Sequence, residues 1–195
     1  MWGAARARDF ISPELARLLN QAGLYLQGRA VYAEASPLFE AALAIRRAVL
    51  GEGHPDTAQS LNNLAGLLQT EGDTAQARPL YEEALAIHRK VFGNEHPEIA
   101  TSLNNLGGLL LAQGERQEGI AHLACALAIW EAALPAGHPD ILLSLWNLGD
   151  TYREIGRHAE ARGYLLRARA IKEGHPEYPR PSLEAIDAAL GASKG

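Results

Sequence analysis

The chain has a single cysteine, Cys125, and only 6% of its 195 residues are aromatic. One cysteine cannot form an internal disulfide or supply a thiolate cage for zinc. No apolar run approaches the ~18 residues that a membrane-spanning helix needs, so we expect no membrane association. The first ten residues lack the apolar core of a secretory signal, and we therefore expect a cytoplasmic protein.

An excess of positive charge is also missing. The chain has 18 Lys and Arg against 23 Asp and Glu, which gives a formal net charge of −5. Proteins that hold nucleic acid through phosphate contacts need a basic surface, so we expect no nucleic-acid partner. Hydrophobic residues make up 47% of the chain. Alanine and leucine supply most of them, which favours a helical core over strands.

A step of 42 residues runs through the sequence. The tripeptide His54-Pro55-Asp56 returns 42 residues later at 96–98 as His-Pro-Glu, and once more at 138–140 as His-Pro-Asp. Self-similarity at a fixed period is typical of repeat architectures. A second motif, Ser-Leu-Asn-Asn-Leu with one Trp in place of Asn in the last copy, keeps the same step at 60–64, 102–106 and 144–148.

These motifs divide the chain into a leader, four repeats and a capping helix with a tail. The fourth repeat is shortened. We expect the leader at 1–12, the four repeats within 13–178 at about 13–54, 55–96, 97–138 and 139–178, and the capping helix and tail at 179–195.

Each repeat has the pattern of two helices. Pro55 suits a first helical position, where its missing N–H costs nothing, and Asp56 opposes the helix dipole. Leu61 and the apolar residues at i+3, i+4 and i+7 from it form one apolar face before Gly72 ends the helix. A short helix after Ser182 would cap the open end of the stack. We expect the repeat helices near 13–28, 31–49, 55–70, 74–91, 97–112, 116–133, 139–154 and 158–172.

The second repeat has small residues at Ala65, Ala77 and Ala84 around an aromatic residue at Tyr81. This spacing resembles the tetratricopeptide repeat (TPR) pattern. In the third and fourth repeats a leucine stands where the aromatic residue is expected. The 42-residue step and the Leu-Asn-Asn-Leu segment are similar to the longer repeats of kinesin light chains, and similar repeats occur in bacterial regulators with an NB-ARC-type ATPase. The resemblance implies an all-α, right-handed TPR solenoid of four helical hairpins with a C-terminal capping helix.

No motif indicates catalysis or a cofactor. His54, His96 and His138 start successive repeats and would lie at least ~8–10 Å apart, whereas zinc ligands must all lie ~2 Å from the ion. The sequence has neither a phosphate-binding GxxxxGK[ST] loop nor HExxH. Cys125 lies between two alanines on an expected helix, and we expect a small buried side chain there. We therefore expect no enzyme activity, no metal and no cofactor.

An amide recurs on each first helix, on the side opposite the apolar stripe, because a helix turns ~100° per residue. An amide both donates and accepts hydrogen bonds, so it can satisfy the backbone of an extended peptide without reading its sequence. The family resemblance implies that first helices line the concave side and that the asparagines hold peptide backbone. The alternatives are that they cap or brace neighbouring helices, or that they are simply solvated. The amides are Gln21, Asn63, Asn105 and Asn147.

Trp146 stands where the two earlier repeats have asparagine. With Leu111 and Leu143 it would form an apolar anchor pocket between the third and fourth repeats, or it would be wedged between repeats. Arg153 lies in the stretch 142–178, which contains 6 basic and 5 acidic residues. These basic residues would attract an acidic segment of a partner, as the kinesin-light-chain resemblance suggests, or pair along their own helices.

The sequence thus predicts a protein-interaction module that binds an extended peptide or a partner surface in the concave groove. An alternative is the sensor or scaffold segment of a larger NB-ARC-type signalling ATPase, whose other domains lie on a longer chain. Self-assembly through the exposed ends of the hairpins is a further alternative.

Overall fold

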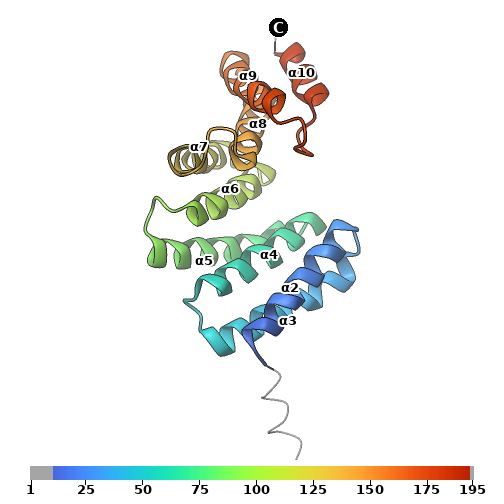
Figure 1. Cartoon of the computed structure of the whole chain (residues 1–195), viewed down its shortest axis with the longest axis vertical. Coiled ribbons are helices and arrows are strands. Elements are labelled where there is room, and N and C mark those ends of the chain that lie inside the picture. Colours follow the sequence, from blue (N-terminus) through green and yellow to red (C-terminus); the bar gives the residue numbers. More distant parts are fainter. Residues whose placement is uncertain (1–10, 194–195) are drawn as a thin grey trace, which may run out of the picture. The chain divides into compact units, whose positions relative to one another are not determined.

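The computed structural model describes residues 11–193. The first ten residues of the expected leader at 1–12 and the last two residues of the tail therefore lie outside the described range. The described residues form nine α-helices and no strand. Figure 1 shows them in chain order. They are α2 (Pro13–Gly28), α3 (Tyr32–Leu50), α4 (Pro55–Glu71), α5 (Thr74–Phe92), α6 (Pro97–Ala112), α7 (Arg116–Ala133), α8 (Pro139–Glu154), α9 (His158–Gly174) and α10 (Leu183–Ala192).

The recurring His-Pro dipeptide starts three of the first helices. His54 is the N-cap of α4, and its Nδ1 accepts the backbone N–H of Asp56 at 3.1 Å. His96 and His138 cap α6 and α8 in the same way, at 3.2 Å. Proline follows at the first helical position, where no intrahelical N–H is needed. The histidines are therefore helix caps.

The two helices of a hairpin meet where a small residue faces a large one. A Cβ built on Gly149 of α8 would lie 2.7 Å from Cγ of Leu165 in α9, so only glycine fits there. The same close approach joins Gly23 of α2 to the ring of Phe39 in α3. Leu165 is completely buried, as is Phe39 at the equivalent place. Leucine thus fills the position where the family pattern has an aromatic ring.

The described residues form two compact units, one up to Asn94 and one from Glu95. In the first unit α2 pairs with α3 and α4 with α5, and α3 packs against α4. Its core centres on Phe39, Leu61 and Leu67, all fully buried.

In the second unit α6 pairs with α7 and α8 with α9, and α7 packs against α8. The last helix, α10, packs mainly against α9 and also touches α8, through Ile186, Ala189 and Leu190. It occupies the place that α4 takes against α3 and α2 in the first unit. The structure confirms the expected all-α fold of helical hairpins followed by a C-terminal helix.

Candidate peptide-binding face

Two adjacent positions on the first helices have different surroundings. On α2, Asn20 is buried, and its Nδ2 donates to Oγ of Ser60 in α4 at 3.0 Å. The same hydroxyl accepts from Nη1 of Arg46 in α3, also at 3.0 Å. Asn62 is buried at the equivalent place on α4. Asn20 thus braces α2 against α4, whereas the third repeat has a partly exposed Asn104 at this place and the fourth has Trp146.

The second position carries the predicted amides, and these have a different environment. Gln21 is exposed, and Asn63, Asn105 and Asn147 are partly exposed. None of the four side-chain amides hydrogen-bonds to another residue in the range 11–193. Each unit contains two of them, on α2 and α4 and on α6 and α8. These amides keep donors and acceptors available to a ligand.

Trp146 lines a pocket of about 500 Å³ on the second unit. Leu143 and Asn147 of α8 line it too, so the structure brings three predicted site residues together. Leu111 does not line this pocket. Its Cγ lies 2.8 Å from where a Cβ on Gly119 would be, so it packs inside its own hairpin.

The other wall of the pocket comes from the segment between α9 and α10. The residues that line it from there are Pro179, Arg180, Pro181, Ser182 and Ala185 of α10. Sequence reasoning did not predict this wall, because the segment lies outside the repeat pattern. The one local signal is its two prolines, which precede the N-cap serine of α10.

Four contacts hold the segment that leads to this wall. Lys172 is buried, and its Nζ donates to the carbonyl oxygens of Pro176 and Tyr178. Tyr178 donates its hydroxyl to the carbonyl of Gly137 at 3.1 Å. The ring of His175 stacks on that of Tyr178, with centroids 4.9 Å apart. The pocket wall is thus tied to α9 and to the loop before α8.

Arg153 has an intramolecular partner. Its Nη2 lies 2.6 Å from Oδ1 of Asp150, one turn earlier on α8. Several other basic side chains of the stretch 142–178 are also paired. These pairs are Arg157–Glu160, Arg167–Glu131, Arg169–Glu173 and Arg169–Asp187. The contacts support the reading in which this basic stretch pairs mainly within the protein.

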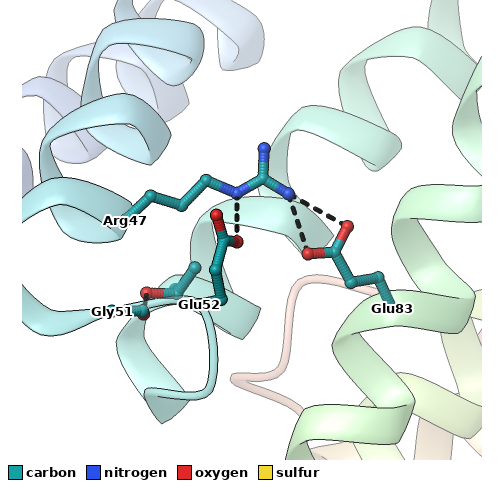
Figure 2. A network of polar contacts seen from close by, with 5 residues as sticks. Arg47, Gly51, Glu52 and Glu83 are labelled. Atoms are coloured by element: carbon teal, nitrogen blue, oxygen red, sulfur yellow. Dashed lines mark hydrogen bonds and ion pairs between the residues drawn. The ribbon is translucent and has the colours of Figure 1, made fainter.

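A further charged cluster joins the second helices of the first unit (Figure 2). Arg47 at the end of α3 reaches Glu52 through Nε at 2.8 Å, and Glu83 of α5 through Nη2 at 2.8 and 3.0 Å. The hydrogen bond with Glu83 raises the pKa of Arg47. The cluster connects the two hairpins, and both of its carboxylates are paired with Arg47.

Cys125 is exposed, which corrects the expectation of a buried side chain. The buried side of α7 is formed by Leu123, Ala126, Leu127 and Trp130, and position 125 lies off that side. Within residues 11–193 no three His, Cys, Asp or Glu side chains gather as a metal site would require. No helix in that range is both long and apolar enough to cross a membrane.

The fold is similar to several solved structures. TPR-like repeats of a kinesin light chain from Podospora anserina share 28% identity at a TM-score of 0.78, covering 93% of this chain and 86% of that chain. BtubC (BKLC) from P. vanneervenii shares 24% identity at a TM-score of 0.74, over 87% of this chain and 68% of that one. The apo form of RapI is 21% identical, with a TM-score of 0.72 over 84% of this chain and 58% of that one. The last two likenesses show the fold alone.

Among curated proteins none matches this sequence significantly. The repeats themselves are kinesin-light-chain-like, as the sequence motifs predict. A family model described as tetratricopeptide repeat matches residues 14–90, 61–118 and 98–174, and the chain therefore belongs to the tetratricopeptide repeat family.

Proposed function

We propose that this chain is a cytoplasmic protein-binding module that holds an extended peptide, or an extended segment of a partner, against its first helices. TPR repeats are in general protein-interaction modules, and the finer assignment depends on one observation. The same position on four first helices carries an amide that is at least partly exposed and makes no hydrogen bond to another described residue. Such an amide can donate to a peptide carbonyl and accept from a peptide N–H.

The backbone beside Asn105 leaves room for a ligand. Gly108 lies one turn after Asn105 on α6, and a Cβ added there would meet no atom within 4 Å. A peptide main chain can therefore approach α6 closely beside the amide.

The Trp146 pocket supplies selectivity in this proposal. Trp146 and Leu143 offer apolar surface, and Asn147 lies in the same pocket. An apolar side chain of the peptide fits there while the neighbouring backbone reaches Asn147. Buried aromatic contacts of this kind carry a large share of binding energy in many interfaces. Arg153 would favour an acidic neighbour in the ligand only where that group competes with Asp150, with which Arg153 is paired.

The test uses peptides that bind the wild-type protein. They are selected from a displayed library of random sequences. Their affinities are measured by fluorescence anisotropy for the wild type and for Asn63→Ala, Asn105→Ala and Asn147→Ala, singly and combined. Each lost hydrogen bond costs about 0.5–1.5 kcal/mol, so a single change should weaken binding about 2- to 12-fold. Gln117→Ala, which removes an exposed amide from the second helix α7, is the matched control.

The triple variant should bind far more weakly than any single variant, with an unchanged circular dichroism spectrum. A triple variant that is folded and binds the selected peptides as tightly as the wild type contradicts the proposal. The expectation that this sequence is part of a larger signalling ATPase concerns other domains and stays a prediction.

A further inference from the structure

The outer side of α2 carries a stripe of apolar side chains that are exposed or partly exposed. Leu18 is 55% exposed and Tyr25 is 63% exposed. Leu15 and Ala22 complete the stripe, partly and fully exposed. The positions 15, 18, 22 and 25 alternate steps of three and four, which is the spacing of a two-helix packing seam.

The equivalent side of α4 is covered. Ser60 and Leu67 stand one repeat after Leu18 and Tyr25, and both are fully buried because α3 packs there. Ser60 accepts a hydrogen bond from Arg46 of the preceding hairpin. Leu18 has no polar side-chain atom for such a contact. The stripe on α2 therefore calls for an apolar partner.

The helix at the other end of the chain contrasts with α2. α10 buries Ile186 and Leu190, and its exposed residues include Glu184 and Asp187. α2 instead exposes large apolar side chains on this side, which marks the side as an interaction surface.

Charge at the two ends of the stripe indicates what covers it. Glu14 lies in the first turn of α2, where its carboxylate interacts with Arg17, and Arg29 caps the end of the helix and donates from Nη1 to the hydroxyl of Tyr25 at 3.1 Å. The Arg29 guanidinium rests over the ring of Tyr25, 5.8 Å from its centroid. The stripe therefore has a negative charge near its start and a positive charge at its end. Two copies of α2 that run in opposite directions would bring each negative charge close to a positive one.

We propose that a second copy of this chain covers the stripe, with the two α2 helices packed antiparallel about a two-fold axis. In this arrangement Leu18 of each copy faces Ala22 of the other, so a large side chain meets a small one. Glu14 of each copy comes within a turn of Arg29 of the other. A two-fold interface requires this self-complementarity, because each contact occurs twice. The proposal is independent of peptide binding.

The test is sedimentation velocity of the whole chain from the low to the high micromolar range. A single helix pair gives a small interface, so we expect a concentration-dependent equilibrium between one and two chains. Leu18→Glu should keep the protein at the mass of one chain. Leu24→Glu is the matched control, because Leu24 is 49% exposed on the same helix but lies off the stripe.

Wild-type protein that stays at the mass of one chain throughout overturns the proposal. So does a Leu18→Glu variant that dimerises like the wild type, or a Leu24→Glu variant that dissociates while Leu18→Glu does not. Thermal unfolding followed by circular dichroism verifies that both variants are folded.

Charge reversal tests the antiparallel direction. Glu14→Arg alone and Arg29→Glu alone should each weaken the dimer, whereas the double variant should restore it, because each new arginine then faces a new glutamate. A double variant weaker than both single variants overturns the antiparallel arrangement.

Discussion

Nη1 of Arg46 lies 3.0 Å from Oγ of Ser60, and this buried contact joins α3 to α4. The same guanidinium nitrogen donates to the carbonyl of Asp56 at 2.7 Å. Burial lowers the pKa of Arg46, and the nearby carboxylate of Asp56 offsets part of this effect. Ser144 occupies the same place two repeats later, yet its Oγ is buried without a hydrogen-bond partner, since Trp130 stands where Arg46 would be.

This difference predicts opposite outcomes for two identical substitutions. Ser60→Ala removes the acceptor of two buried donors and should lower the free energy of unfolding by about 1–3 kcal/mol. Ser144→Ala removes a buried hydroxyl that has no partner and should leave stability unchanged or raise it. Urea unfolding followed by circular dichroism measures both. Equal losses at the two serines would show that the Arg46 contact adds nothing.

A second pair of substitutions tests the packing inside the last hairpin. Gly149→Ala would place a Cβ 2.7 Å from Leu165 and 3.3 Å from its backbone nitrogen, so α8 and α9 must separate. We expect a loss of about 1–3 kcal/mol. Gly163→Ala on α9 meets no atom within 4 Å and should stabilise the helix by ~0.5–1 kcal/mol. Thermal melting compares the two variants directly. A Gly149→Ala protein that melts at the wild-type temperature would contradict the close approach of α8 and α9.

The ionisation of Tyr81 predicts how stability responds to alkaline pH. Burial raises the pKa of Tyr81 to about 12, and its hydroxyl donates to Oε1 of Gln69 at 3.1 Å. An unfolded tyrosine ionises near ~10, so between these pH values the unfolded state binds fewer protons and stability falls as pH rises.

The loss linked to Tyr81 should be complete near pH ~12 and amount to at most ~3 kcal/mol. Tyr81→Phe is the control, because it retains the ring and cannot ionise. Urea midpoints at several alkaline pH values should fall less steeply for this variant than for the wild type. Parallel curves for the two proteins would contradict a raised pKa at this residue.

The Trp146 pocket predicts unequal effects for two exposed leucines. Leu143 is 39% exposed on α8 and lines the pocket, whereas Leu166 is 46% exposed on α9 and does not line it. Leu143→Ala should weaken the binding of library-selected peptides, and Leu166→Ala should not. Calorimetric titration measures the affinity of one selected peptide for each variant. The prediction is wrong if the two variants bind the peptide with equal affinity.

The sequence predicted the helices closely because their ends are marked locally. Pro55 starts α4 and Gly72, with a φ of 90°, ends it, so two residues identify the helix without knowledge of the rest of the fold. The position of the partly exposed amide could also be predicted from the sequence. Helical geometry turns Asn63 away from the side that buries its neighbour Asn62.

The pocket beside Trp146 was only partly predictable. Leu143 is in the pocket as expected, but the second wall depends on how Lys172 and Tyr178 hold a non-repeating segment. The Tyr178 contact joins residues 41 positions apart, and no local pattern encodes such a contact. The same limit applies to Cys125, whose alanine neighbours do not reveal which side of α7 faces the core.

The side-chain amide signals of asparagine in a nuclear magnetic resonance titration test the central claim most directly. On addition of a selected peptide, the Nδ2 signals of Asn63, Asn105 and Asn147 should shift in proportion to occupancy. The Nδ2 signal of Asn20, which donates to Ser60, should stay in place. Saturating peptide that leaves all three partly exposed amides unshifted would contradict the account.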